Sequence, residues 1–218
     1  MIVLRIVSGE GACAVKRTRK RPVAAGLVAA AFVVPLMLAA CQSRGVPPDT
    51  FDLTAPANVD NVAGSTRAQI LIVEPSALKS LDSQNIVVKA SPTEIEYLAK
   101  SQWSDRLPKV VQARLVEAFE NTGKVRAVSK PGEGLVIDYQ IVTDIRAFQA
   151  NVGAGSRDAL VSLSVKLVSD RTGKVVRSRV FDVAVPLGST GAVQIVDALN
   201  AAFERAASDI VRWVFRAI

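Results

Sequence analysis

Two cysteines, Cys13 and Cys41, are the side chains of this 218-residue chain with the widest choice of chemistry. A cysteine can act as a nucleophile, bind a metal, form half of a disulfide or accept a lipid. The sequence contains no histidine. This excludes Ser-His and Cys-His nucleophilic pairs as well as imidazole metal sites. The role of Cys41 therefore has to be inferred from the residues around it.

The segment before Cys41 has the layout of a secretory signal peptide. A compact basic run at 16–21 is followed by eighteen uncharged, mostly apolar residues at 23–40. A basic region, an apolar region and a small-residue end are typical of such signals. Eighteen residues are near the lower limit for a membrane-spanning helix, and Pro35 interrupts the run, so a cleaved signal is favoured over an uncleaved anchor. We expect residues 1–40 to be removed, and Cys13 with them.

Leu38, Ala39, Ala40 and Cys41 resemble the bacterial lipobox, in which a branched aliphatic residue and two small residues precede a cysteine. The resemblance implies that the Cys41 thiol receives a diacylglycerol, that the chain is cut before it, and that the new amine is acylated with a palmitate-type chain. Three acyl chains would hold the protein firmly on a membrane, because one chain gives only marginal binding. The alternative is an unreactive cysteine buried in an apolar helix. With Cys13 removed, no disulfide or thiolate cluster can form.

The charge balance argues against a nucleic-acid partner. The sequence has 27 Lys and Arg against 20 Asp and Glu, a formal net charge of +7. Six of these basic residues and one acid lie in 1–40, so the other 178 residues carry 21 basic and 19 acidic side chains, a net charge of +2. Most of the excess thus belongs to the predicted signal. Carboxylate-only or Ser-Lys catalysis stays open to such a chain, but its acids are scattered. We expect no enzyme activity, no cofactor and no metal.

The rest of the chain predicts a tether and one domain. Residues 41–50 read as a lipidated tether because Gly45, Pro47 and Pro48 discourage regular structure, and 51–218 as a single domain. Apolar runs and alternation predict strands at 51–53, 70–73, 86–89, 94–97, 125–128, 135–146, 161–167 and 175–185. The last three form an antiparallel meander. The predicted fold is an α+β two-layer sandwich, a mostly antiparallel sheet with two main helices packed on one face.

The two helices are predicted from apolar residues at helical spacing. One pattern begins at Trp103 and Leu107 and ends at Asn121-Thr122-Gly123; Pro108 fits only its first turn, so the helix starts near Leu107. The other stripe is more regular and consists of Val196, Leu199, Phe203, Ala206, Ile210 and Trp213. We expect both tryptophans to lie in the core, although they could also line a lipid groove.

Three polar features could bind ligands or partners. The glycines of 153–155 connect two strands, which favours a hairpin loop over a dinucleotide site. The amides of 188–191 precede a helix and could hold an anion, but an N-cap by Ser189 or Thr190 is the simpler prediction. The polar face of the meander, with Asp138, Gln140, Asp144, Arg146 and Lys166, is a solvated surface or a docking face. Its exposed edge invites strand addition.

The order of these motifs resembles that of the ABC-type transport auxiliary lipoproteins, which include paraquat-inducible-type outer-membrane lipoproteins. The block from Ile86 to Pro108 carries most of the likeness, and the family-motif and core residues are Phe51, Leu53, Ile86, Trp103, Leu107 and Pro108. Phe51 departs from the family, which often has Tyr there.

The resemblance implies partners and a location. Family members accompany mammalian-cell-entry (MCE) domain proteins and an ABC ATPase–permease that move phospholipids or other hydrophobic molecules between membranes. The expectation is a non-enzymatic docking lipoprotein, anchored at the outer membrane and facing the periplasm. Gln42, the residue after Cys41, agrees with outer-membrane sorting, because the Asp that favours inner-membrane retention in enteric bacteria is absent at that position. Two alternatives remain: a module that binds phospholipid itself, and an envelope-assembly lipoprotein unrelated to transport. Self-association into a ring also stays open.

Overall fold

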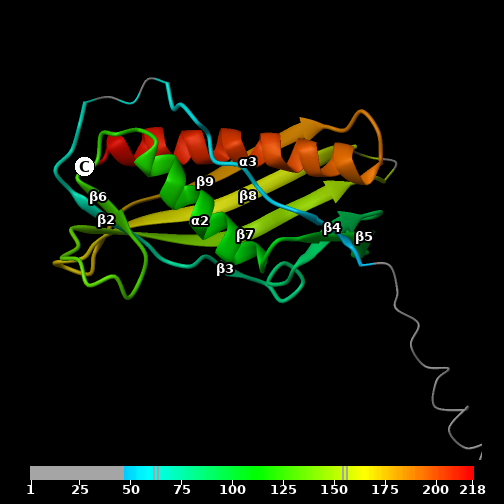
Figure 1. Cartoon of the computed structure of the whole chain (residues 1–218), viewed down its shortest axis with the longest axis horizontal. Helices are drawn as coiled ribbons and strands as arrows, with labels where there is room; N and C mark the ends of the chain where they lie inside the picture. The colour runs from blue at the N-terminus through cyan, green and yellow to red at the C-terminus, as the bar shows by residue number, and fades with distance from the viewer. Residues whose placement is uncertain (1–46, 61, 63, 154, 156) are drawn as a thin grey trace, which may run out of the picture. The chain divides into compact units, whose positions relative to one another are not determined.

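Strand β7 (Tyr139–Asn151) is the central strand of the sheet (Figure 1). Along one edge it pairs over its full length with antiparallel β8 (Asp158–Ser169), which pairs in turn with antiparallel β9 (Val175–Pro186). These are the three strands of the predicted meander. The computed structural model describes residues 47–218 except 61, 63, 154 and 156.

The other edge of β7 is shared by three short parallel strands in succession. β2 (Gln69–Ile72) pairs with its start, β3 (Ser76–Ala77) with its middle and β4 (Asn85–Lys89) with its end. β5 (Glu96–Trp103) runs antiparallel to β4, and β1 (Asp49–Phe51) and β6 (Ala127–Ser129) add parallel strands to β5 and β2. The long pairings of β7 with β8 and of β8 with β9 are thus antiparallel, whereas the short strands on the other edge of β7 pair with it in parallel.

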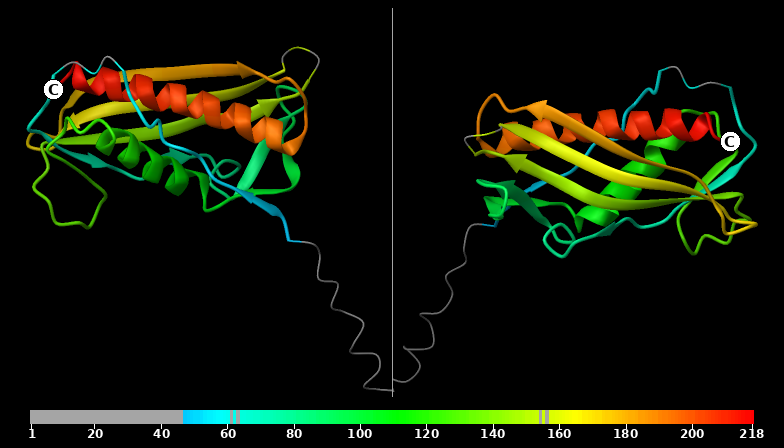
Figure 2. Two further views of the ribbon diagram at one scale, coloured as in Figure 1. Left: turned by 45° about the horizontal axis from the view of Figure 1, so that its top comes forward. Right: turned by 180° about the vertical axis from the view of Figure 1, so that it is seen from behind.

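Both helices cover the same face of this sheet, as the two views of Figure 2 show. α3 (Ala192–Phe215) lies along β8 and β9, while α2 (Leu107–Glu120) crosses β2 and β6 and meets α3. Phe119 of α2 stacks on Phe215 of α3, with ring centroids 6.4 Å apart. The predicted α+β sandwich with two helices on one face is confirmed.

The core lies between these helices and the inner face of the sheet. The apolar residues of the 161–167 alternation and of the α3 stripe are all buried. Phe148 of β7 is central, because its ring contacts Trp103 edge to face at 5.8 Å and Phe203 of α3 at 6.3 Å. Aromatic pairs of this geometry add stabilisation beyond the apolar area that they bury.

A segment before β2, residues 52–60, passes over the helix layer (Figure 1). The Thr54 amide donates to the Asn200 side chain of α3 over 2.8 Å, and the Asn121 side chain donates to the Pro56 carbonyl over 3.1 Å. Leu53, at its start, is buried. We call residues 52–60 the strap.

α2 begins at Leu107 with Pro108 in its first turn, as predicted, and Trp103 ends β5. Two local predictions were wrong. Leu135 and Ile137 precede β7 and Leu135 is exposed, because β7 begins only at Tyr139. Gly191, with no side-chain hydrogen bond, caps α3 in place of Ser189 or Thr190. In addition, β1 begins at Asp49, within the predicted tether.

Replacing Phe148 by alanine tests whether this aromatic contact holds the two layers together. We expect Phe148→Ala to lower the free energy of unfolding by about 3–5 kcal/mol, because the cavity would open between β7 and α3. Urea denaturation measures it. The control Val136→Ala, at a side chain 80% exposed, should change stability by less than about 0.5 kcal/mol. Equal effects of the two substitutions would contradict the assignment of the core.

Candidate functional site

The predicted lipidation site, Cys41, and the lipobox residues Leu38, Ala39 and Ala40 lie outside the described residues. The structure does show where the chain that follows them enters the domain. Thr50 faces Gln102 on β5, whose side-chain amide donates to the Thr50 hydroxyl over 3.1 Å, and the Ser104 amide donates to the Phe51 carbonyl over 2.7 Å. The entry point is therefore tied into the sheet.

The family-motif residues come together where β1, β4, β5 and the start of α2 meet. Phe51 is paired with Trp103, which is 1% exposed, and the Trp103 amide donates to the Gln84 carbonyl over 2.7 Å. Leu53, Ile86, Leu107 and Pro108 are buried, and Pro108 stands in the first turn of α2. The motif residues thus build this corner of the fold, and none of them presents a reactive group.

Two arginines connect this corner to its neighbours. Arg114 of α2 donates to Asp52 over 2.6 Å and to Glu117 over 2.7 Å. Burial opposes its charge, but the hydrogen bonds to Glu117 and Asp52 outweigh burial and raise the pKa of Arg114. Arg106 donates to Glu74, and this hydrogen bond raises its pKa. Both guanidinium groups therefore stay charged and hold the strap and the β2–β3 connection against α2.

The outer face of the sheet, opposite the helices, is polar. Asp138, Asp144, Arg146 and Lys166 are exposed there, as the sequence predicts, and Gln140 donates to Asp170 over 2.6 Å. β9 pairs only with β8 among the described strands, so its other edge is open. That edge strand carries the exposed valines 175, 176 and 180. An open edge of twelve residues can accept an added strand.

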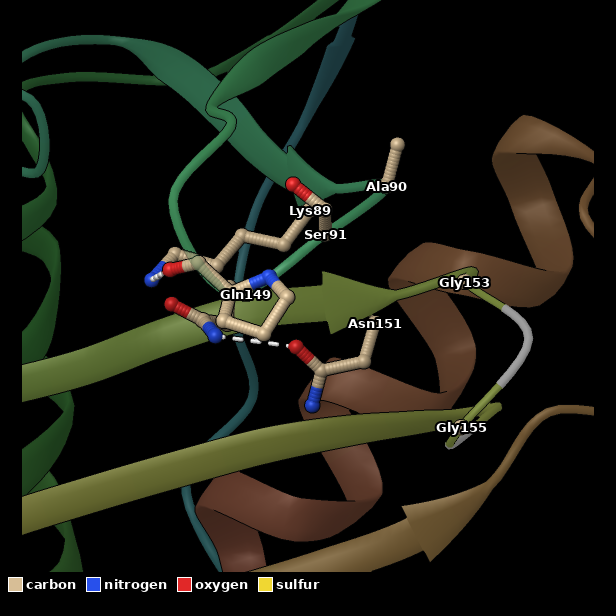
Figure 3. A pocket seen from close by; sticks show the side chains of 8 residues that line it. Lys89, Ala90, Ser91, Gln149, Asn151, Gly153 and Gly155 are labelled. Carbon is tan, nitrogen blue, oxygen red and sulfur yellow. Dashed lines mark hydrogen bonds between the residues drawn. The ribbon is translucent and has the colours of Figure 1, made fainter.

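A cleft of about 540 Å³ opens beside the end of β7, between that strand and the β4–β5 turn (Figure 3). The Gln149 amide donates to the Asn151 side chain over 2.9 Å, which donates to Asp158 over 2.6 Å. At the rim, Gly153 approaches Ala90 so closely that a Cβ there would overlap the Ala90 carbonyl oxygen. Gly153 therefore fixes the β7–β8 loop against the β4–β5 hairpin, as a hairpin-loop glycine would.

The groups around this cleft and on the outer face offer hydrogen-bond donors and acceptors. Among residues 47–218, apart from the four undescribed positions, no cluster of three or more His, Cys, Asp or Glu side chains could hold a metal. Within the same part of the chain, no helix is long and apolar enough to cross a membrane. The open edge of β9 offers unpaired backbone donors and acceptors, and the outer face offers exposed charged side chains.

Both tryptophans are buried by aromatic neighbours. Trp213 packs edge to face on Phe181, with ring centroids 5.7 Å apart. The Arg179 guanidinium lies over the Phe181 ring, 5.0 Å from its centroid. Trp103 and Trp213 are only 1% and 8% exposed, and neither lines the cleft beside the end of β7. Both tryptophans therefore lie in the core, as predicted, and not in the alternative position along a lipid groove.

The fold is a two-layer α+β domain with a polar outer face and an open sheet edge, and comparisons with known proteins show the family to which it belongs. Residues 51–211 match the family described as "ABC-type transport auxiliary lipoprotein component". The chain belongs to this family. Membership makes it an auxiliary lipoprotein of ABC-type transport, associated with the cell envelope.

Individual relatives agree in sequence and fold. An uncharacterized protein of Bradyrhizobium diazoefficiens is 33% identical over 172 residues, which are 78% of this chain and only 45% of that protein. The crystal structure of a DUF330 family protein from Xanthomonas campestris matches with a TM-score of 0.72 and 26% identity, over 78% of this chain and 96% of that one. A second crystal structure of an uncharacterized protein matches with a TM-score of 0.62 at 13% identity, over 78% and 99%.

The close approach at Gly153 has a measurable consequence. We expect Gly153→Ala to lower the free energy of unfolding by about 1–3 kcal/mol, because the loop must move away from the Ala90 carbonyl. The matched control is Gly155→Ala in the same loop, where an added Cβ meets nothing within 4 Å. Urea unfolding of the two variants measures the difference. Equal stability would show that the loop is not fixed at Gly153.

Proposed function

We propose that this protein is the outer-membrane-anchored component of an MCE-type ABC system for intermembrane lipid transport. The observation that carries the proposal is the family match over residues 51–211, directly downstream of the lipobox at Cys41. In this proposal the acylated Cys41 holds the chain at the outer membrane, and Gln42 after it favours that membrane over inner-membrane retention. Residues 42–50 give the domain its reach.

The protein acts as a docking partner and not as an enzyme. The absence of histidine from the sequence supports this, because common nucleophilic and general-base machinery depends on it. ATP hydrolysis belongs to the ATPase–permease, and the MCE protein provides the path for the lipid. The contribution of this chain is then a fixed position for the MCE assembly at the outer membrane.

Docking takes place through β9 and the adjoining outer face. The open edge of β9 offers backbone hydrogen bonds to an extended segment of the partner, and its exposed valines offer apolar contacts. Arg177 adds positive charge at the same strand. Natural sheets usually protect an exposed edge of this length. The open edge of β9 therefore supports the proposal that a partner covers it.

The packing of the core favours this scaffold over a lipid-binding module. A module that holds a phospholipid between helices and sheet needs a cavity there, and Phe148 occupies that space in contact with Trp103 and with Phe203. The proposed scaffold needs no such cavity.

Loss of the thiol tests the anchor. We expect Cys41→Ser to remain full-length, to lack the acyl groups and to leave the outer-membrane fraction, because the acceptor atom for diacylglycerol is gone. Intact-mass measurement and membrane fractionation check this. Cys13→Ser is the matched control and should change neither, since Cys13 lies in the predicted signal. Unchanged mass and fractionation of Cys41→Ser would refute the anchor.

A crosslinked pull-down tests the partner and the surface together. A photoreactive amino acid is placed at Val180 on β9 or, as control, at Val193 on α3, both of which are exposed. We expect crosslinking in envelopes to recover an MCE-domain protein, identified by mass spectrometry, from the Val180 position alone. Recovery of only outer-membrane assembly factors would exclude the transport role and leave the anchor intact. Copies of this chain joined at Val180 would instead show ring formation through β9.

A further inference from the structure

We propose that the β4–β5 hairpin rests on the lipid surface that holds Cys41, through Ile95 and Tyr97. This inference rests on the proposed lipidation of Cys41 and adds a membrane-contact site on the folded domain. It follows from the length of the tether, from where the tether enters the sheet, and from the side chains exposed at that place.

The tether is short compared with the domain. Cys41 and Pro47 are six residues apart, which allows at most about 20 Å even for a fully extended chain. β7 alone, with 13 residues, is about 43 Å long. Acylation of Cys41 therefore keeps the entry end of the domain close to the lipid headgroups, whatever the tilt of the rest.

The hairpin lies at that entry end. β1 runs parallel to β5 and pairs Asp49 with Ser101, so the chain before Asp49 comes from the side of the β5 residues that precede Ser101. Those residues lead back through Lys100 to Tyr97 and to the hairpin turn. Figure 1 shows β1, β4 and β5 together at this end of the sheet.

The hairpin exposes the side chains that a lipid surface accommodates. Tyr97, on β5, is 49% exposed, and Ile95, which directly precedes β5, is 45% exposed. Tyr97 is the only exposed aromatic residue in the described part of the chain. Tyrosine suits the membrane interface, because its ring is apolar and its hydroxyl reaches the headgroups.

Lys100 adds a second, independent feature. It has a φ of 53°, the only positive φ among the described non-glycine residues, where the register between β4 and β5 shifts. A bulge of this kind redirects a side chain, and a non-glycine residue in the left-handed region is kept only where its surroundings enforce it. Lys100 is exposed and takes part in no ion pair formed by the described residues. Its ammonium can reach lipid phosphates beside the tether.

The charges of the hairpin determine how this contact should respond to salt. Lys89 and Lys100 are balanced by Glu94 and Glu96, so the hairpin has no net charge. The contact therefore depends on apolar burial more than on attraction to anionic lipid. We expect it to persist at high salt, unlike a contact made by a basic patch.

Quenching by brominated lipids tests the inference in the lipidated full chain. Tyr97→Trp is reconstituted in phosphatidylethanolamine–phosphatidylglycerol vesicles that contain a lipid with brominated acyl chains. The control is Val136→Trp, exposed before the start of β7, at the opposite end of that strand from its pairing with β4. Buried Trp103 and Trp213 give the same background in both. We expect Tyr97→Trp to lose most of its added emission, at low and high salt alike, and Val136→Trp to keep it.

Vesicle flotation separates the two ways of failing. If the variants float and Tyr97→Trp is quenched no more than Val136→Trp, the hairpin contact is wrong and the anchor stands. If they do not float, the lipid anchor itself is refuted, and this inference with it. Ile95→Trp is a second reporter from the same surface and must behave as Tyr97→Trp does.

Discussion

The structure depends on how β7 distributes its backbone hydrogen bonds. One edge is committed to a single long partner, β8, while the other is divided among β2, β3 and β4. Because each short strand has only a few residues to pair, none could form a stable sheet without that common strand. Within the sheet, β5 and β1 are connected to β7 through three paired residues of β4.

On the inner face of the sheet, the aromatic contacts of Phe148 also connect β7 to the rest of the domain. They connect the β4–β5 corner through Trp103 and the helix layer through Phe203, so one side chain of β7 contacts both. A closely packed interior of this kind leaves the surface as the place for function. The open edge of β9 and the exposed hairpin are on different parts of that surface, which allows a partner and a membrane to be engaged at once.

The sequence alone predicts the parts of this fold that repeat a pattern. The stripe of α3 and the alternation of 161–167 are long enough for their period to be unambiguous, and the structure buries each of these residues. Trp103 shows the limit: its spacing to Leu107 fits a helix, yet pairing with Phe51 places it in a strand. No local pattern signals the contacts between residues far apart in sequence: the parallel pairs of β7, the contact between Gly153 and Ala90, and the hydrogen bond from Arg114 to Asp52. The alternation of the meander already indicates a polar face with an exposed edge, but that β9 forms this edge is known only once the strand order is known.

The parallel pairing of β1 with β5 has a mechanical consequence for a domain held by its N-terminal end. A pull on the chain before Asp49 acts along β1, so it loads the hydrogen bonds to β5 together, in shear, instead of opening them one after another. Behind β1, buried Leu53 and the bonds of Thr54 to α3 resist the same pull. A domain fastened in this way can transmit tension between a membrane and a docked assembly without unravelling from its point of attachment.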